Sequence, residues 1–412
     1  MSPIPKLRIG TSYWLDQYKG RPPRFPAMHG RHEAEVVVIG GGITGCLTAH
    51  LLTRAGIRVI LVEAQRIGRG STAASTALIM QEPDVDFRDL SKRYGEARSR
   101  RVWLQSRRSL RGFVTLLRQN RIDASLEVIP SVYWTSDAST AVDLKRELSR
   151  RRHAGIQGTW LSAAALLRTT GIRGAAGILT PGNAQVNPYK ACLGVASRAR
   201  SAGARLFEHS PVKRISGGRT GVRISLEDGE VHASWAIVAT GYATAEFRPL
   251  AGRFRMTNTY VIATTPISAP TKRRMGLGPV MLWDTSDPYH YARWTPDRRL
   301  LLGGEDEPRT RVRNRREWLK NHASSLSSHL VSLFPALDGI KPQYAWEGLF
   351  ATTPDGLPYV GTHRRYPRQL FALGYGGNGM TFGYMAADIL RRYVTGKETE
   401  EDRFYGFGRN RR

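Results

Sequence analysis

Three glycines near the start of the first regular pattern have the spacing of a phosphate-binding turn. Gly40, Gly42 and Gly45 form G-x-G-x-x-G between the apolar run 36–39 and an expected helix that begins at Ile43. Gly40 permits the tight turn, Gly42 lets the backbone approach a pyrophosphate, and Gly45 lets the helix pack closely on the strand. The N-terminus of the helix adds free N–H groups and partial positive charge for the phosphates.

Glu63 ends the next expected strand, residues 58–62, and lies 23 residues after Gly40. A carboxylate there accepts hydrogen bonds from both hydroxyls of a ribose, which argues against the 2′-phosphate of NADP. Strand, glycine turn, helix and second strand make a βαβ unit, so the sequence predicts a dinucleotide site.

A second strand–turn–helix pattern occurs late in the chain. The glycine-rich turn 374–379 follows an apolar strand at 370–373 and precedes an expected helix over 380–394. A second helix N-terminus can face the other end of the same cofactor, and its dipole stabilises the negative charge of a reduced flavin. The pair of turns favours FAD, although the second turn could also simply pack on the first helix.

The other patterns predict an α/β (α+β) fold with two domains. A discontinuous Rossmann-type FAD-binding domain is expected over 34–125, 175–250 and 342–396, and a substrate domain over 126–174 and 251–341. Alternating aromatic strands between 252 and 304 indicate that the substrate domain contains an antiparallel sheet. An arm without regular structure, 1–33, is expected to be pinned to the body by its aromatic residues, and a basic tail, 397–412, to end the chain.

The composition is that of a globular protein with an unusual charge. The 62 Lys and Arg exceed the 34 Asp and Glu by 28, but the longest basic run has three residues, which favours a dispersed surface charge over a nucleic-acid-binding arm. Two cysteines are too few for a disulfide framework or a cysteine-rich zinc site, and no metal is expected. No apolar run approaches the length of a transmembrane helix and no secretory signal is evident, so we expect a cytoplasmic enzyme.

Several ordered segments resemble the FAD-dependent D-amino-acid oxidase, glycine oxidase and sarcosine oxidase superfamily, with a preference for its γ-glutamylputrescine oxidase-like branch. The likeness covers residues 35–394 and rests on 38–45, Glu63, 70–77, 238–241 and the run from W-E-G-L-F at 346–350 through 353–361 to 374–381. It implies oxidation of a C–N bond in an amine or amino acid by hydride transfer to flavin N5, giving an imine that hydrolyses. Sarcosine oxidase-like members attach FAD through a later cysteine; no cysteine follows Cys192 here, so non-covalent FAD is expected.

The resemblance also assigns cofactor contacts to each segment. Residues 71–76 would follow the pyrophosphate and ribityl chain, the backbone of Val212 would hold adenine, and 376–381 would face the flavin ring. The residues implied to bind FAD are Gly40, Gly42, Ile43, Thr44, Gly45, Glu63, Ser71, Thr72, Ala73, Ser75, Thr76, Val212, Thr240, Gly241, Gly374, Gly376, Gly377, Asn378, Gly379, Met380 and Thr381.

One departure from the family pattern bears on the substrate. Phe350 stands where glycine oxidase-like members have an arginine that binds the substrate carboxylate. Either Arg293 replaces that arginine or the substrate is an amine without the carboxylate. Tyr375 is expected to contact substrate or flavin, whereas Tyr260, His290 and Tyr291 could line the pocket or simply pack in the sheet.

Two other functions fit the charge. Some relatives of this family oxidise a C–N bond in tRNA, and the net charge of +28 would suit such a substrate. A nucleic-acid-binding protein that keeps FAD only structurally is the third possibility, disfavoured by the dispersed charge. For the leading function the partners are a small amine or amino acid and an electron acceptor, either oxygen or a carrier.

Overall fold

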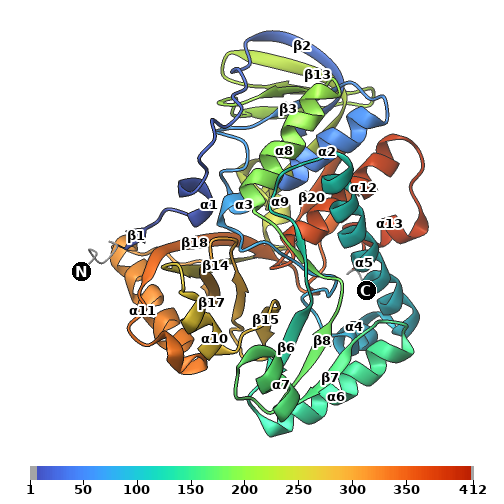
Figure 1. Cartoon of the computed structure of the whole chain (residues 1–412). Coiled ribbons are helices and arrows are strands. Elements are labelled where there is room, and N and C mark those ends of the chain that lie inside the picture. Colours follow the sequence, from blue (N-terminus) through green and yellow to red (C-terminus); the bar gives the residue numbers. More distant parts are fainter. Residues whose placement is uncertain (1–6, 410–412) are drawn as a thin grey trace.

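The computed structural model describes residues 7–409 and contains two large sheets, each covered by helices (Figure 1). The smaller of these, with eight strands, carries the first glycine turn. Its order is β10 (Arg205–Phe207), β3 (Val59–Val62), β2 (Gly30–Ile39), β13 (Gly229–Gly241), β12 (Val222–Ser225) and β11 (Arg214–Gly217), with β20 (Tyr366–Leu373) between β13 and β19 (Tyr359–His363). The predicted α/β (α+β) class and its Rossmann-type part are confirmed.

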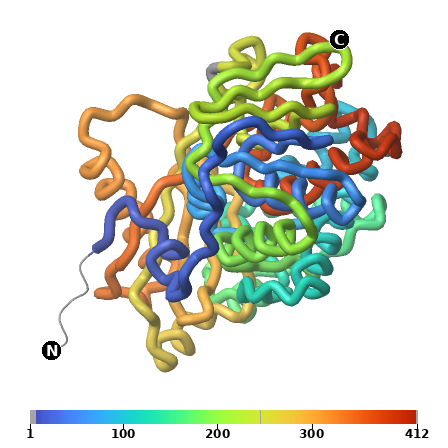
Figure 2. The backbone as a smooth tube through the Cα atoms, turned by 90° about the horizontal axis from the view of Figure 1, so that it is seen from above, coloured from blue at the N-terminus to red at the C-terminus, as the bar shows by residue number. Residues whose placement is uncertain are grey.

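β13 is the central strand of this sheet. It pairs in parallel with β2 along its length, while its first half pairs with β12 and its second half, from Ala236 to Gly241, with β20. Figure 2 shows β2 in dark blue beside β13, although some 190 residues separate them in sequence. Val36, Val37 and Val38 are fully buried because both faces of β2 are covered: Val36 and Val38 belong to the core cluster that includes α2, and Val37 to the cluster on the other face.

The helices next to this sheet pack mainly on one another. α2 (Ile43–Arg54) lies between α8 (Pro188–Ser201) and α12 (Gly379–Val394), and α12 also packs on the long α5 (Glu96–Gln119). A Cβ added to Gly383 of α12 would lie 2.8 Å from Oγ1 of Thr44, so the N-terminal turns of α2 and α12 approach closely. The helices that follow the two glycine turns therefore start side by side.

The second sheet has nine strands and lies in the other half of the molecule. Its order is β1 (Arg8–Ile9), β18 (Pro342–Thr352), β14 (Arg255–Thr264), β17 (Leu300–Pro308), β16 (Tyr291–Trp294), β15 (Met281–Asp284), β6 (Ser131–Thr135), β8 (Ala176–Thr180) and β7 (Thr159–Ser162). α11 (Arg315–Leu333) covers β14, β17 and β18. The described residues also form a three-stranded sheet of β4 (Leu78–Ile79), β9 (Ala184–Gln185) and β5 (Glu127–Val128), and the helices α3 (Ser71–Ala74), α4 (Phe87–Tyr94), α6 (Ala138–His153), α7 (Ala163–Thr170), α9 (Arg248–Ala251), α10 (Ala269–Met275), η1 (Ala245–Phe247) and η2 (Pro335–Leu337).

The domain division differs from the expected one at two strands. β8 lies within the range 175–250 and β18 within 342–396, both expected in the FAD-binding domain, yet both belong to the nine-stranded sheet. Each strand pairs there with residues distant in sequence, such as Tyr260 with Glu347. The local sequence pattern does not reveal such a distant partner. We therefore assign β8 and β18 to the half of the molecule that contains the nine-stranded sheet.

The two ends of the chain are more regular than expected. In the arm, β1 extends the nine-stranded sheet and α1 (Tyr13–Asp16) buries Trp14 to 1% exposure. At the other end, α13 (Glu400–Phe404) precedes a buried ion pair in which Nε of Arg409 lies 2.6 Å from Asp355. The arm and most of the expected tail are thus integral parts of the fold; residues 1–6 and 410–412 lie outside the described range.

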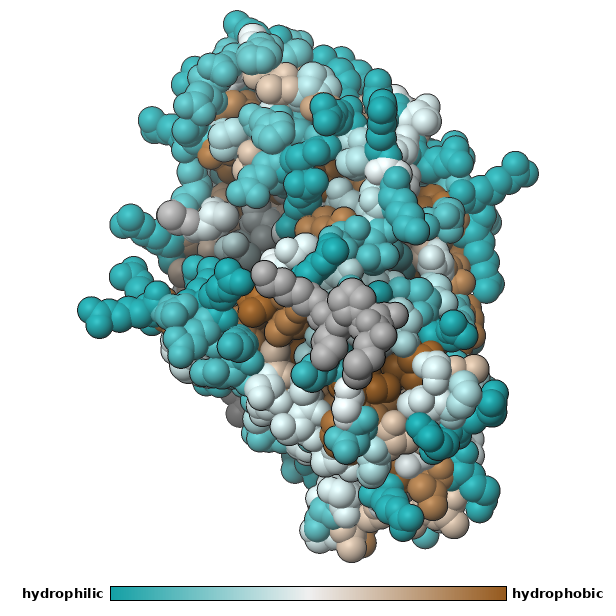
Figure 3. Space-filling view, turned by 60° about the vertical axis from the view of Figure 1, so that its left-hand side comes forward, coloured by the Kyte–Doolittle hydropathy of each residue, from teal (hydrophilic) through white to brown (hydrophobic). Residues whose placement is uncertain are grey.

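The charge is spread over the surface. On the face drawn in Figure 3, hydrophilic side chains dominate and apolar areas are smaller and broken up. Among residues 7–409 no helix combines the length and apolar character needed to cross a membrane.

Candidate active site

The two glycine turns lie on either side of the end of β13. A Cβ added to Gly40 would lie 2.6 Å from the carbonyl oxygen of Ala239, and the N–H of Gly374 donates to the carbonyl oxygen of Gly241 over 2.9 Å. Thr240, between those two residues of β13, is thereby placed between the turns. The structure brings together turns that are more than 300 residues apart, as binding of one long cofactor requires.

The first turn has the shape of a pyrophosphate cradle. A Cβ added to Gly45 would lie 1.9 Å from the carbonyl oxygen of Gly40, so close packing of helix on strand excludes any side chain there. Gly42 differs, because its Cβ would meet only Oγ1 of Thr72, at 3.3 Å. The same oxygen accepts the N–H of Ile43 over 3.0 Å. Open backbone beside Gly42 at the start of α2 fits a phosphate group.

The adenosine end of a dinucleotide also has suitable partners. Glu63 accepts the N–H of Gly41 over 2.7 Å through Oε2 and that of Gln65 over 2.8 Å through Oε1, and each oxygen keeps a lone pair for a ribose hydroxyl. The N–H of Ser210 donates to the carbonyl oxygen of Glu63, which places Val212 nearby. Val212 itself is half-buried, as a backbone position beside adenine would need.

A cavity lies between the sheets, next to the second glycine turn, and together with its opening to solvent it spans about 1130 Å³. One wall is the segment 71–76, which is fastened to β18: Oγ of Ser71 donates to the carbonyl oxygen of Leu349 over 2.8 Å, and Nε1 of Trp346 to that of Ala74 over 2.9 Å. The cavity is lined by Ser71, Ala74, Ser75, Thr76, Leu78, Met80, Glu82, Pro83, Asp84, Gly241, Tyr242, Thr259, Trp283, Tyr289, Tyr291, Gly348, Leu349, Phe350, Ala351, Tyr375, Gly376, Gly377, Asn378 and Gly379. Phe350 and Tyr375, both predicted from the sequence, therefore reach it, as does Tyr291.

The charge of this lining is opposite to that of the molecule. Glu82 and Asp84 line the cavity, whereas within residues 7–409 no lysine, arginine or histidine does so. Six aromatic side chains surround the same space: Tyr242, Trp283, Tyr289, Tyr291, Phe350 and Tyr375. Carboxylates and aromatic faces both attract cations, so the cavity suits a positively charged ligand.

The second glycine turn is held from the cavity side. Oδ2 of Asp84 accepts the N–H groups of Gly377, over 2.5 Å, and Asn378, over 3.0 Å. Behind the turn, Oγ1 of Thr381 donates to the carbonyl oxygen of Met80 over 2.7 Å, and Met380 is buried. The turn and the first residues of α12 are therefore rigidly placed opposite the segment 71–76, where a flavin ring would lie.

Two carboxyl groups near the cavity have raised pKa values. Desolvation by the surrounding protein, and to a smaller extent the charge of Asp306, raise the pKa of Asp84 to about 7 against the opposing effect of its two N–H donors. The Asp84 side chain is nevertheless open to the cavity and the groove. Burial likewise raises the pKa of Asp306 to about 6, although a hydrogen bond from Thr259 and the charge of His290 act in the other direction. Neither shift was foreseen from the sequence.

Arg293 and Tyr260 are not where the sequence-based expectation put them. The guanidinium of Arg293 donates to the carbonyl oxygens of Thr76, Ala77 and Val186 over 2.8–3.1 Å, and burial lowers its pKa to about 9. Tyr260 stacks on His322 with 3.7 Å between ring centroids, under α11. Arg293 thus binds backbone in the interior, and Tyr260 packs on the face of the sheet away from the cavity.

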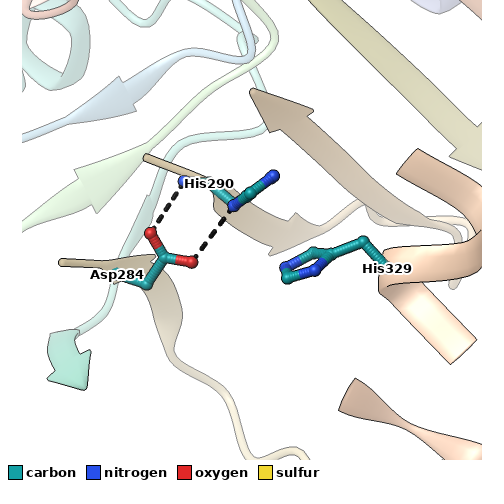
Figure 4. A group of neighbouring side chains, drawn as sticks. All are labelled: Asp284, His290 and His329. Atoms are coloured by element: carbon teal, nitrogen blue, oxygen red, sulfur yellow. Dashed lines mark hydrogen bonds and ion pairs between the residues drawn. The ribbon is translucent and has the colours of Figure 1, made fainter. Parts of the chain in front are cut away.

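His290 also points away from the cavity, toward α11 (Figure 4). Its Nδ1 lies 3.2 Å from Oδ2 of Asp284, and its ring stacks on that of His329 with 4.0 Å between centroids and 22° between planes. The three residues bring possible metal-ligand atoms within 4.8 Å of one another. Oδ1 of Asp284 already accepts the backbone N–H groups of Ser286 and His290, which indicates a brace for the β15–β16 hairpin. The expectation of no metal stays a prediction.

The two cysteines lie beneath the first glycine turn. The Sγ atoms of Cys46 and Cys192 are 3.7 Å apart, and each is within hydrogen-bonding reach of the carbonyl oxygen of Gly41. The hydrogen bond to Cys192 and burial both raise the pKa of Cys46. Both thiols are buried packing groups under the cradle.

Several lining residues were missed by sequence reasoning. Leu78, Met80, Glu82 and Asp84 follow the segment 71–76 directly, so continuing that segment by eight residues would have included them. Tyr242, Trp283 and Tyr289 come just after or at the end of strands, and nothing in their spacing distinguishes them from packing residues.

Comparison with known proteins identifies the family of the chain. Residues 35–393 match the family model described as FAD dependent oxidoreductase. Gamma-glutamylputrescine oxidoreductase of Escherichia coli is 28% identical over 90% of this chain and 85% of its own, and glycine oxidase of Bacillus subtilis is 24% identical over 90% and 96%. Among solved structures, L-amino acid deaminase from Proteus myxofaciens has a TM-score of 0.78 at 14% identity, covering 96% of this chain and 97% of that one. The resemblance inferred from the sequence motifs is confirmed, and the chain belongs to the FAD dependent oxidoreductase family.

Proposed function

We propose that this flavoenzyme oxidises the C–N bond of a cationic amine that carries no carboxylate next to the reacting nitrogen. The observation that carries the proposal is the cavity lining, which combines aromatic side chains and carboxylates with no cation. An α-carboxylate entering this space would meet Glu82 and Asp84 and would lack the bidentate arginine partner that such groups need. Phe350 stands in place of that arginine, and Arg293 is occupied by backbone carbonyls.

The residues present fit FAD bound without a covalent link. The open backbone at Gly42 would hold the pyrophosphate, Glu63 the ribose, and the start of α12 the flavin ring. FAD, when bound, supplies the acceptor for the hydride that leaves the substrate carbon.

The chain contributes binding and orientation. The aromatic walls hold the amine and exclude water from the reacting centre. Because a neutral amine can lose hydride without a dedicated general base, the cavity does not need one. Oxygen or a carrier as electron acceptor, and action in the cytoplasm, belong to the same proposal.

The test is a reduction assay on the purified protein. We expect a flavin absorption band near 450 nm that bleaches anaerobically with amines but not with the matching α-amino acids. Bleaching by α-amino acids alone, or by tRNA alone, would overturn the proposal.

Position 350 gives a sharper test of the same idea. Phe350→Arg introduces a charge-assisted partner for a carboxylate, and such bonds contribute about 1.5–3 kcal/mol, so KM for a small amino acid should fall roughly tenfold or more. The amine KM should rise because the new cation repels it. Phe350→Leu is the matched control, and an unchanged preference in Phe350→Arg would remove this position from the substrate site.

A further inference from the structure

We propose that Asp84 is a specificity-determining residue that binds a second ammonium group of the substrate, which makes the preferred substrate a diamine. This inference rests on the proposed amine oxidation and names its substrate class. Asp84 lies in the loop between β4 and α4, at the border of the main cavity and an adjoining groove. A group bound there would lie at the outer end of a substrate whose other end reacts in the main cavity.

The direction of the carboxylate follows from its contacts. A Cβ added to Gly377 would lie 3.2 Å from Oδ2 of Asp84 and 2.5 Å from the hydroxyl of Tyr289, so carboxylate and phenol meet at one point of the cavity wall. Oδ2 is used by the two N–H donors of the turn. Among the hydrogen bonds of residues 7–409, Oδ1 accepts none, so it remains for a ligand.

A second, independent feature marks the same place. Oδ1 of Asp306 is buried without a hydrogen-bond partner, and Asp306 is close enough to Asp84 to raise its pKa. In the part of the chain that the structure describes, neither carboxylate has an ion pair with lysine or arginine. An unpartnered buried carboxylate oxygen is costly, and an ammonium group with three donors would satisfy it.

Three other acidic residues of the groove are already partnered. Asp89 pairs with Arg88 and Lys92, Asp355 pairs with Arg409, and Glu307 accepts hydrogen bonds from Tyr260 and Trp318. Asp287, which also lines the groove, is exposed, so the protein-enclosed negative charge without a basic partner among residues 7–409 is that of Asp84 and Asp306.

A competing reading uses the arginines of the groove. Arg93 and Arg255 line it and could attract a distal carboxylate on the substrate. Arg93 already donates to the carbonyl oxygen of Pro354 over 2.8 Å. Both lie outside the main cavity, whereas Asp84 lines cavity and groove alike, so the observations favour the ammonium group.

The experiment compares linear α,ω-diamines of four to six carbons with n-alkylamines of the same length on the FAD-loaded enzyme. We expect KM for the diamine to be at least tenfold lower. Asp84→Asn should raise KM for the diamine about tenfold or more beyond any change in KM for the alkylamine, so the preference for the diamine should be lost. Asn keeps an oxygen for the N–H groups of Gly377 and Asn378, so the turn should stay folded. Asp89→Asn, which removes a partnered carboxylate from the same groove, is the matched control.

A binding measurement without turnover completes the test. 2,5-Dimethylhexane-2,5-diamine keeps two –NH3+ groups, and its amine-bearing carbons carry no hydrogen, so it cannot lose hydride. It should raise the melting temperature of the native enzyme, and Asp84→Asn should abolish that rise. Equal KM values for diamines and alkylamines, unchanged by Asp84→Asn, would overturn this inference and leave amine oxidation standing. Preference for an amine with a distal carboxylate, lost in Arg255→Ala, would also overturn it. If no amine reduces the flavin, the proposed function fails as well.

Discussion

Asp84 combines two tasks in one carboxylate. One oxygen holds the turn 376–378 near the hydroxyl of Tyr289, and we propose that the other binds the substrate. Because the same carboxylate would hold the cofactor-facing turn and bind the substrate, it would couple the position of the substrate to that of the turn. Its raised pKa makes this link sensitive to pH.

Diamine binding should strengthen as pH rises through about 7. Asp84, with a pKa of about 7, is neutral below that value and anionic above it, and only the anion pairs with ammonium. Asp306 titrates nearby at about 6, whereas burial raises the pKa of Tyr289 and Tyr291 well above this range. KM for a diamine, measured from pH 5.5 to 8 and corrected for the neutral fraction of the reacting amine, should fall across this window. Asp84→Asn should flatten the profile; a KM that rises with pH would contradict the assignment.

Substitutions of two glycines in the first turn should have different effects, one on flavin binding and the other on stability. Gly42→Val fills space that the protein leaves open, so flavin content should be lost while the apoprotein stays folded. Gly45→Ala places a Cβ 1.9 Å from the carbonyl oxygen of Gly40, and the fold itself should lose roughly 2 kcal/mol or more. The ratio of absorbance at 450 and 280 nm and the melting temperature separate the two. Full flavin content in Gly42→Val would show that the pyrophosphate lies elsewhere.

At the scale of elements, the sequence locates strands and helices well but not the faces they present. The expected helix over 380–394 coincides with α12, and the two strand–turn–helix units are as expected. Tyr260, however, is one residue away from Thr259, which lines the cavity, and His290 stands between Tyr289 and Tyr291, which do so too. Because successive side chains of a strand alternate between faces, a one-residue difference decides the site. The partners of β8 and β18 were missed for a related reason: pairing depends on residues distant in the chain.

Arg293 illustrates the same limit within β16. It shares the face of Tyr291 but lies two residues further along, under the backbone of residues 76–77. Arg293→Met keeps the volume and removes the guanidinium donor from the carbonyl oxygens of Thr76, Ala77 and Val186. Ala77 keeps the N–H of Val186 as a donor, and each oxygen left without a partner costs about 1–3 kcal/mol. We expect a loss of roughly 3 kcal/mol or more in urea unfolding, with the ratio of KM values for amine and amino acid unchanged. A selective rise in amino-acid KM would instead return Arg293 to the substrate site.

At the scale of the molecule, an acidic cavity sits inside a chain with a net charge of +28. The long-range field repels a dication, while the short contacts within the cavity are screened much less by salt. Raising ionic strength from about 10 to 150 mM, over which the Debye length falls to about 8 Å, should therefore increase kcat/KM for a diamine. The ionic strength is varied with an inert salt at fixed pH, so that only electrostatic screening changes. A fall in kcat/KM would mean that steering by the acidic groove outweighs the net charge.

The pairing of β1 with β18 has a consequence for how the protein is made. Arg8 lies opposite Tyr344, so the place of β1 in the sheet exists only after more than 330 further residues have left the ribosome. Until then the nascent chain must carry β1 and the neighbouring α1, including the indole of Trp14 that donates to the carbonyl oxygen of Ser75 over 2.8 Å, without the final sheet partner of β1. This strand is thus synthesised long before the strand on which it docks.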